Sequence, residues 1–335
     1  MSDTAPGVAQ PPMAGALPLV SVVMPAHNNA SHIAAAIDSV LAQDYPCLEI
    51  IVVDDGSTDS TREVVAGYGD KLRLLCQENK GSAVARNLGV LSAHGKYVAF
   101  LDADDVWWRN KIRYQVEALA RTGHKMAYSR FIWWPADAGG RHTAPEVEFA
   151  IADNPRRSSA TVKTGWVYAE LLLDCIVWTS TVIVEKAELD KSGLFDETLR
   201  KGQDYDLWLR LSWQVEMLGL ETPTALYRIH PSSITYNVKE INYEYVIISR
   251  AVARWGEIGR DGASPKPGLV AARLARSSLG HGYAHLTKGN PRIAAESFLQ
   301  SMKHSRPNAR SLVYFLAARI KCLIQALHSR TGADK

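Results

Sequence analysis

The chain has 335 residues, of which 47% are apolar and 22% charged, and this composition excludes a largely disordered protein. Its net charge of +3 is unevenly distributed: residues 240–335 hold 15 Lys and Arg against 6 Asp and Glu, a net +9, which leaves −6 for residues 1–239. A basic C-terminal part fits an anionic membrane surface or an acidic partner, and equally an ordinary solvated helical surface.

Residues 1–17 are predicted to form a flexible N-terminal tail. They contain no Lys or Arg and are interrupted by prolines, so they lack the basic start and apolar middle of a secretion signal. No apolar run reaches the roughly 18 residues needed to cross a bilayer, and the longest, 311–327, contains Arg319 and Lys321. The four cysteines are too far apart for a C-x-x-C site, which favours free thiols in a reducing cytoplasm.

From residue 19 the chain alternates β-rich apolar runs with helical segments. The predicted strand and helix pairs are 19–26 with 30–43, 48–55 with 57–68, 71–77 with 82–93, and 97–105 with 109–122. Four such units predict an α/β fold with a parallel sheet covered by helices on both faces. Ligands of such sheets bind beyond the carboxyl ends of the strands, where this sequence places His27, Asn28 and several aspartates.

The later part of the chain is less regular. Residues 135–163, rich in Pro, Gly and Arg, are predicted to be a loop or small insertion, and a first domain is predicted to span 18–238. Residues 239–335 carry only helical patterns and are predicted to form a basic α-helical C-terminal region. The last helix, 311–327, either lies on a membrane surface or packs against the preceding helices.

The segment VVDDGSTDST, 52–61, ends a predicted strand with two carboxylates, Asp54 and Asp55. Ser57 or Thr58 can cap the next helix, so the segment is either a capped turn or part of a binding site. Because side chains alternate along a strand, one of the two aspartates can face a cleft and accept hydrogen bonds from a base or a ribose.

The segment VAFLDADDVWW, 98–108, places three aspartates directly after an apolar run. In an extended segment Asp102 and Asp104 share one face, whereas Asp105 points away. A divalent cation that takes one or two carboxylates together with phosphates and water would offset their repulsion. A solvated turn is the alternative.

Six motifs in order make the chain resemble the family 2 glycosyltransferases. The resemblance covers roughly residues 18–235 and is carried by VSVVMPAHNN, IIVVDDGSTDST, NKGSAVARNLG, YVAFLDADDVW, SGLFDETLRKGQDYDLWLRL and YRIHPSSIT. It implies a GT-A-type, Rossmann-like, mostly parallel sheet flanked by helices. It also implies a site for a nucleotide sugar, in which Pro25, Ala26, His27 and Asn28 line the nucleotide pocket and Asp55 recognises the uracil of a UDP-sugar donor.

The same resemblance assigns further contacts. Arg86 would lie near the nucleotide, and Asp102 is the first residue of the Asp-X-Asp motif. Asp104 and Asp105 would contact the ribose and the metal ion, Mn²⁺ or Mg²⁺; which aspartate touches the ion directly stays open. His230 joins the metal or the diphosphate in several relatives, although a lone histidine is also a common structural residue.

The expected general base is Asp204, at the start of a predicted helix where the family carries an acidic pair or its variant. Gln203 replaces the more frequent Glu, which leaves the base but can alter acceptor contacts. Such a carboxylate can remove a proton from the acceptor hydroxyl as that oxygen attacks the anomeric carbon with inversion. Without the resemblance, a carboxylate stabilised by the helix N-terminus explains Asp204 equally well. Trp133, Trp134 and Trp178 either form an aromatic platform for an acceptor or belong to the core.

We therefore expect an inverting, metal-dependent transferase that moves a sugar from a UDP-sugar to a glycan or lipid-linked acceptor in surface polysaccharide synthesis. The alternatives are a nucleotidyltransferase, whose usual Gly-rich phosphate loop is not evident, and a non-catalytic nucleotide-sugar-binding scaffold. We expect a cytoplasmic protein without a nucleic-acid partner. Peripheral contact with the inner face of the membrane and the oligomeric state stay open.

Overall fold

The computed structural model describes residues 16–136, 142, 162–230, 238–305 and 309–331. All but the last two residues of the tail predicted for 1–17 lie outside these ranges, and so does most of the predicted loop 135–163. Within the described ranges, no helix combines the length and the apolar character needed to cross a bilayer.

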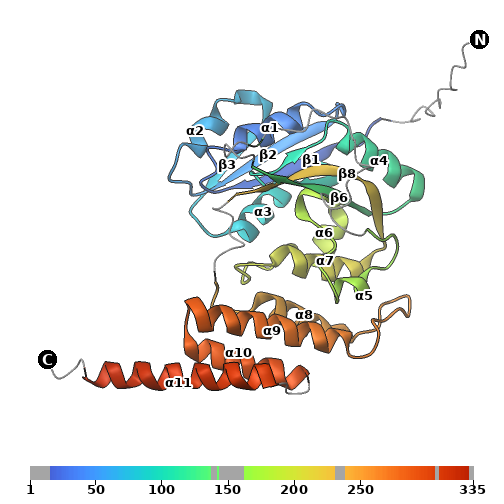
Figure 1. Ribbon diagram of the computed structural model, residues 1–335. Helices are drawn as coiled ribbons and strands as arrows, with labels where there is room; N and C mark the ends of the chain where they lie inside the picture. The colour runs from blue at the N-terminus through green and yellow to red at the C-terminus, as the bar shows by residue number, and fades with distance from the viewer. Residues whose placement is uncertain (1–15, 137–141, 143–161, 231–237, 306–308, 332–335) are drawn as a thin grey trace, which may run out of the picture.

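The described strands form one eight-stranded sheet (Figure 1). They are β1 (Val20–Ala26), β2 (Leu48–Asp55), β3 (Arg73–Gln77), β4 (Tyr97–Phe100), β5 (Val106–Trp107), β6 (Met126–Pro135), β7 (Ile183–Glu185) and β8 (Met217–Ile229). Their order in the sheet is β3-β2-β1-β4-β7-β6-β8-β5. The four strands expected from the βα alternation, β1 to β4, are mutually parallel, whereas β7 pairs antiparallel with β4, and β5 with β8.

Helices cover both faces of this sheet, with α1, α2 and α4 on one side and α3, α6 and α7 on the other (Figure 1). Their bounds are α1 (Ile33–Leu41), α2 (Thr61–Ala66), α3 (Ser82–Leu91), α4 (Lys111–Thr122), α6 (Lys186–Ser192) and α7 (Gln203–Gln214). The shorter elements are α5 (Tyr168–Leu171) and the 3-10 helices η1 (Gly69–Lys71) and η3 (Thr179–Thr181).

The alternation of side chains along β1 divides the core between these two layers. Val22 and Met24 pack with Ile37 of α1 on one face of the sheet. Val23 lies in the buried cluster on the opposite face, together with Trp208 of α7. All five side chains are fully buried. β1 is thus apolar on both faces, as a central parallel strand must be, and its carboxyl end is held at a fixed edge of the sheet.

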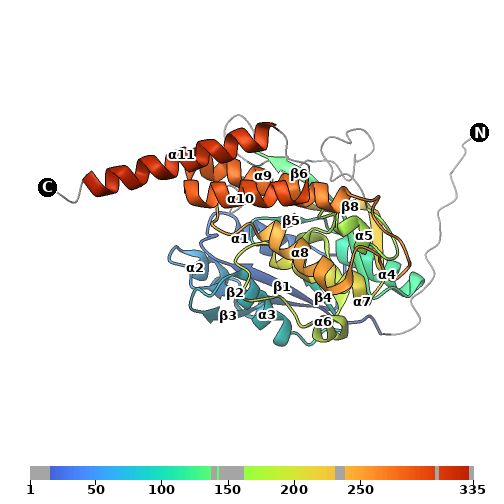
Figure 2. The ribbon, with the colours of Figure 1, turned by 90° about the horizontal axis from the view of Figure 1, so that it is seen from below.

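Four helices follow β8: α8 (Tyr243–Trp255), α9 (Leu269–Lys288), α10 (Pro291–His304) and α11 (Ala309–Thr331). Ile247 of α8 and Leu274 of α9 belong to the same buried cluster as α7, so these helices form a further layer beneath it (Figure 1). Asn290 caps α10 by accepting a hydrogen bond from the Arg292 N–H (2.9 Å). α11 contacts α10 and extends past the ends of α9 and α10 (Figure 2).

Candidate active site

The chain that follows β1 is fixed against the end of β2 by side-chain hydrogen bonds. The His27 Nδ1–H donates to the Asp55 carbonyl oxygen (2.8 Å), which leaves Nε2 to accept from the Asn79 side-chain amide (3.2 Å). Asn28 adopts a left-handed conformation (φ 53°), and its Oδ1 accepts from the Thr58 N–H (2.8 Å). His27 and Asn28 follow Pro25 and Ala26, the last two residues of β1. The four residues expected to line a nucleotide pocket therefore lie together at the carboxyl end of β1, held by hydrogen bonds to the chain after β2.

The two aspartates at the end of β2 have different surroundings. Asp54 is fully buried and accepts from the Arg62 guanidinium (2.9 Å), so its role is structural. Asp55 is 4% exposed; Oδ1 accepts from the Gln77 side chain and the Lys80 N–H, and Oδ2 accepts from the Gly81 N–H (2.8 Å). A carboxylate offers about four lone-pair positions, so Oδ2 keeps one acceptor position for a ligand N–H.

Arg86, on α3, is 6% exposed and donates through Nη2 to Oδ1 of Asp102 (2.5 Å). Its guanidinium carbon lies 5.5 Å from the centre of the Phe195 ring. Burial opposes the charge, but the carboxylates of Asp102 and Asp204 outweigh it and raise the pKa of Arg86. Because its Nε has no hydrogen-bond partner in the described structure, this buried cation keeps a donor for an anionic ligand.

The three aspartates lie in a turn, so the expectation of an extended segment there is wrong. β4 ends at Phe100, and the Asp105 N–H donates to the Asp102 carbonyl oxygen (3.0 Å), which closes a four-residue turn. Asp105 is 3% exposed and accepts from the Ser180 hydroxyl (2.6 Å) and the Arg228 N–H (3.1 Å). Burial and the adjacent carboxylates raise the pKa of Asp105 well above its ordinary value.

Asp104 of this turn and His230, the residue after β8, together offer two ligand atoms suited to a divalent ion. Asp104 Oδ2 and His230 Nε2 are 2.8 Å apart. Across the described ranges, no group of three or more His, Cys, Asp or Glu side chains is arranged to hold a metal. The pair therefore fits an ion that takes its remaining ligands from a diphosphate and water. Asp105, the other aspartate expected at the metal, lines the cavity described below and accepts one hydrogen bond at each of its oxygens.

Asp204 is the second residue of α7, and the helix begins directly after Gly202, whose φ of 73° allows the sharp entry into it. Its Oδ2 accepts from the Thr179 hydroxyl (2.9 Å), and its Oδ1 accepts from the Tyr205 N–H (2.8 Å). Gln203, the residue that departs from the family pattern, donates through its side-chain amide to the Ser82 hydroxyl. The carboxylate of Asp204 is thus held in place and half-buried, while Gln203 ties α7 to α3.

A cavity of about 360 Å³ brings Arg86, Asp102 and Asp204 together at this edge of the sheet. Trp178 and Tyr227 line it, with their ring centres 5.0 Å apart. Trp133 packs edge-on against Trp178 (5.7 Å) and is a supporting residue. Trp134 lies elsewhere, under the Arg228 guanidinium (4.2 Å), so of the three tryptophans proposed as an acceptor platform Trp178 alone is among the residues that line this cavity.

Two participants were missed by sequence reasoning. Arg228 donates through Nε to the Asp104 carbonyl oxygen (2.7 Å) and places a cation beside the aspartate turn. Thr179 orients Asp204 from η3. Arg228 lies on β8 two positions before His230, the residue that follows the strand, so the period of an extended segment places both on one face and could have indicated Arg228. The Thr179 contact joins segments with no sequence pattern in common.

Comparison with known proteins relates this chain to one family. The model of the glycosyl transferase family 2 matches residues 21–167. An uncharacterized glycosyltransferase of Rickettsia prowazekii is 34% identical over 65% of this chain and 66% of that protein, and other Rickettsia relatives are covered over 58% or less of their length. The Escherichia coli protein WfgD, a UDP-Glc:α-D-GlcNAc-diphosphoundecaprenol β-1,3-glucosyltransferase, is 30% identical over 69% of this chain and 85% of its own length.

Solved structures share the fold at low sequence identity. S. aureus TarS 1-349 in complex with UDP-GlcNAc aligns over 90% of this chain and 88% of that chain, with a TM-score of 0.60 at 17% identity. Mannosyltransferase PcManGT from Pyrobaculum calidifontis, in complex with GDP-Man and Mn²⁺, aligns over 91% and 87% with a TM-score of 0.54 at 19% identity. The fold is therefore of the GT-A type, as the sequence predicted. Because matches such as WfgD extend over more than four fifths of the relative at 30% identity, the chain belongs to glycosyltransferase family 2.

Proposed function

We propose that this protein transfers a sugar from a UDP-sugar to a hydroxyl of a lipid-linked or glycan acceptor in bacterial surface polysaccharide synthesis, with inversion and with Mn²⁺ or Mg²⁺ bound. The observation that carries the proposal is the cavity in which a half-buried carboxylate, Asp204, faces the same space as the Arg86–Asp102 pair. The named donor and acceptor of WfgD support the choice of substrates.

The position of Asp204 indicates how the acceptor hydroxyl is activated. Its carboxylate removes the proton of the acceptor hydroxyl while that oxygen attacks the anomeric carbon. The bond from the anomeric carbon to the diphosphate breaks on the opposite side, so the configuration inverts. Thr179 holds Oδ2 of Asp204 by a 2.9 Å hydrogen bond and fixes its direction, and Trp178 and Tyr227 offer aromatic faces to a sugar ring.

The donor side combines neutral and charged contacts. We assign the uracil to Asp55 and to the rim of Pro25, Ala26, His27 and Asn28, because Asp55 Oδ2 retains an acceptor position for the uracil N–H. Arg86 and Asp102 would contact the phosphate and the ribose, since Arg86 retains an unpaired donor at Nε. These residue roles come from the family resemblance and are applied here to the positions of the residues in this structure.

The metal would be held by Asp104 and His230. A bound divalent ion supplies positive charge that stabilises the departing diphosphate. The side chain of Asp104 is 29% exposed and that of His230 10%, so part of each remains accessible to an ion. Arg228 places an additional positive charge beside them.

Substitution of the base tests the proposal. We expect Asp204→Asn to lower kcat for sugar transfer by about 10²–10⁴-fold, the usual contribution of a general base, while UDP binding in the presence of Mn²⁺ is retained. Transfer can be followed with a panel of UDP-sugars, and UDP binding by titration calorimetry with Mn²⁺ and again with EDTA. Binding in EDTA should be weaker than binding with Mn²⁺.

Asp206→Asn is the matched control. Asp206 lies on the same turn of α7 but pairs with Arg210 (2.8 Å), so the same chemical change there should leave kcat close to that of the wild-type enzyme. Full activity of Asp204→Asn would disprove the assignment of the base. UDP binding by the wild-type protein without transfer or release of any sugar would instead favour the non-catalytic scaffold.

The proposal has two further parts. We assign the donor and catalytic residues to a domain spanning 18–238, and residues 239–335 to an α-helical region that contacts the acceptor. We also propose that the protein acts on the cytoplasmic side of the membrane and touches its surface through α11, whose exposed apolar residues Leu316, Ile320 and Leu323 adjoin basic ones.

A further inference from the structure

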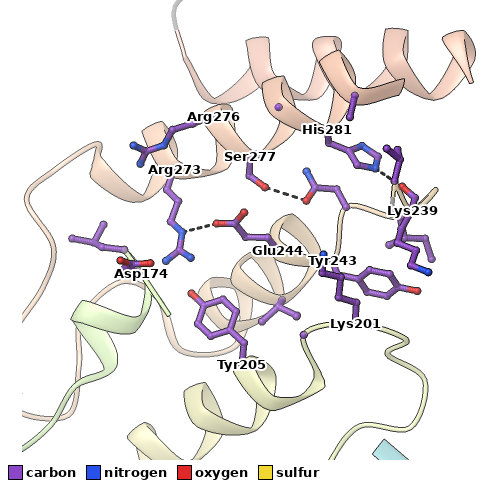
Figure 3. A pocket seen from close by; sticks show the side chains of 18 residues that line it. Asp174, Lys201, Tyr205, Lys239, Tyr243, Glu244, Arg273, Arg276, Ser277 and His281 are labelled. Atoms are coloured by element: carbon purple, nitrogen blue, oxygen red, sulfur yellow. Dashed lines mark hydrogen bonds and ion pairs between the residues drawn. The ribbon is translucent and has the colours of Figure 1, made fainter. Parts of the chain in front are cut away.

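A second cavity, of about 800 Å³, lies where the first turn of α7 meets α8 and α9 (Figure 3). Tyr205 of α7 forms part of one wall, Glu244 of α8 another, and Arg273 and His281 of α9 the side opposite α7 (Figure 3). The cavity is therefore built jointly by the sheet-containing part of the chain and by the C-terminal helices.

The lining of this cavity is positively charged. Lys201, Lys239, Arg273 and Arg276 contribute four cations, against the carboxylates of Asp174 and Glu244. Glu244 is already paired with Arg273. Within the described structure no carboxylate lies within 4 Å of the charged groups of Arg276 and Lys239, so these two cations are available to a ligand.

Arg273 fixes the geometry of the wall. It is 7% exposed and donates through Nε to Glu244 (2.9 Å) and through Nη1 to the Leu171 carbonyl oxygen (3.1 Å). Its guanidinium carbon lies 5.4 Å from the centre of the Tyr205 ring. A single buried side chain thus connects α9, α8 and α7, and Arg276, which is exposed on α9, projects from this rigid frame.

The second cavity adjoins the candidate active site. Lys201, Gly202 and Tyr205 line both cavities, and Asp204 lies between the last two in sequence. A ligand whose hydroxyl reaches Asp204 from the acceptor side can therefore extend into the positive cavity. Val238 and Ile241, which are 40% and 51% exposed, add an apolar surface to the same lining.

We propose that this second cavity binds the diphosphate of a lipid-linked acceptor, with Lys239 and Arg276 contacting the phosphates and Val238 and Ile241 contacting the first part of the lipid. The inference rests on the proposed function, since it names the acceptor class of the same site. Lys239 and Arg276 are two cations beside exposed apolar side chains. A ligand with an anionic group next to an apolar chain matches this combination better than a neutral glycan does.

Gly280 provides a test that does not disturb folding. It lies on α9 and lines the cavity, and a Cβ atom added there meets no other atom within 4 Å. We expect Gly280→Glu to weaken the binding of farnesyl diphosphate about tenfold or more, because a carboxylate then faces the phosphates. Gly280→Gln controls for size, and Gly280→Lys should bind at least as tightly as Gly280→Gln. Binding is measured by titration calorimetry in EDTA with farnesyl diphosphate, farnesol and inorganic pyrophosphate.

The results separate the two proposals. The diphosphate site would be overturned if Gly280→Glu, Gly280→Gln and Gly280→Lys all weakened the binding of farnesyl diphosphate equally. It would also be overturned if the wild-type protein did not bind farnesyl diphosphate. Pyrophosphate binding as tightly as farnesyl diphosphate would overturn the lipid assignment. Lys239→Glu and Arg276→Glu should weaken the same binding while leaving UDP binding unchanged. If instead no UDP-sugar supports transfer but the farnesyl diphosphate series holds, the proposed function fails and the anionic lipid site stands.

Discussion

Lys111 is fully buried at the start of α4, in spite of its charge-bearing side chain. Its Nζ donates to Gln115 Oε1 (2.6 Å) and lies 4.3 Å from the centre of the Trp107 ring. Burial lowers the pKa of Lys111 well below its ordinary value of 10.5. Between that lowered pKa and about 10.5 the unfolded chain binds a proton that the folded protein lacks, so stability rises with pH in this window.

Lys111→Met should remove this pH dependence. The free energy of unfolding of the wild-type protein is expected to rise relative to that of the variant by up to about 1.4 kcal/mol per pH unit above the lowered pKa, which is the value for one proton. Urea unfolding at several pH values from 7 to 9 measures the difference. Parallel pH profiles for the two proteins would show that Lys111 is charged in the folded state.

The close contact between α3 and β1 requires a glycine, which has no side chain, at position 89 of α3. A Cβ atom at Gly89 of α3 would lie 2.4 Å from Val23 Cγ1 of β1, far inside van der Waals contact. α3 carries Arg86 one turn earlier, so this close approach also sets how far Arg86 lies from the carboxyl end of the sheet.

We expect Gly89→Ala to lower the free energy of unfolding by about 1–3 kcal/mol, as overpacking usually does. Adding Val23→Ala should make room, so the double variant should lose less stability than the sum of the single variants. Gly280→Ala is the control, because that helical glycine has open space around it and alanine there should be neutral or stabilising. If the losses in free energy of unfolding caused by Gly89→Ala and Val23→Ala simply added in the double variant, the proposed contact between these residues would be contradicted. Urea unfolding of all four variants provides the measurement.

The sequence predicted the elements that have a strong local pattern. Strands 19–26 and 48–55 appear as β1 and β2 within a residue of their bounds, because apolar β-branched runs between turn residues are specific. The strand predicted for 97–105 ends at Phe100, since apolar periodicity stops before the aspartates and turn geometry then decides the path. The mixed order of the sheet beyond β4 depends on long-range pairing and could not be predicted from local patterns.

The sequence named several residues of the candidate site but not the contacts between them. Asp204, Arg86 and Asp102 were each named from the family resemblance, and they line one cavity, but the ion pair between Arg86 and Asp102 requires the packing of α3 against the sheet. The part played by α9 was not foreseen, because Arg273 and Leu171 are about a hundred residues apart in a chain where only the first two thirds resembled the family.

At the scale of the whole molecule, α11 has two different faces. Ala318 is fully buried against α10, whereas Leu316, Ile320 and Leu323 are 51%, 57% and 62% exposed. Arg319 and Lys321 lie among these apolar residues. A helix with an exposed apolar face and basic neighbours binds anionic interfaces, and both of the alternatives drawn for this segment are therefore compatible with its two faces.

We expect the protein to bind vesicles that contain about 30% phosphatidylglycerol and to bind neutral phosphatidylcholine vesicles weakly, because the basic residues add electrostatic attraction. The triple variant Leu316→Gln, Ile320→Gln, Leu323→Gln should lose this binding in a vesicle sedimentation assay. Leu91→Gln is the control, since Leu91 is 66% exposed on α3, far along the chain from α11. Retention of binding by the triple variant would assign the exposed face to another partner.

The division of one cavity between α7 and α9 bears on how such an enzyme diversifies. We assign nucleotide recognition to β1, β2 and α3, which end by Leu91, whereas the proposed acceptor surface is shared with helices that begin only at Tyr243. Under the proposed assignment, substitutions within α8 and α9 can alter the acceptor site without altering Asp204. Such substitutions must retain Arg273 or an equivalent, because its bonds to the Leu171 carbonyl oxygen and to Glu244 join α9 to α8 and to the sheet-containing part of the chain.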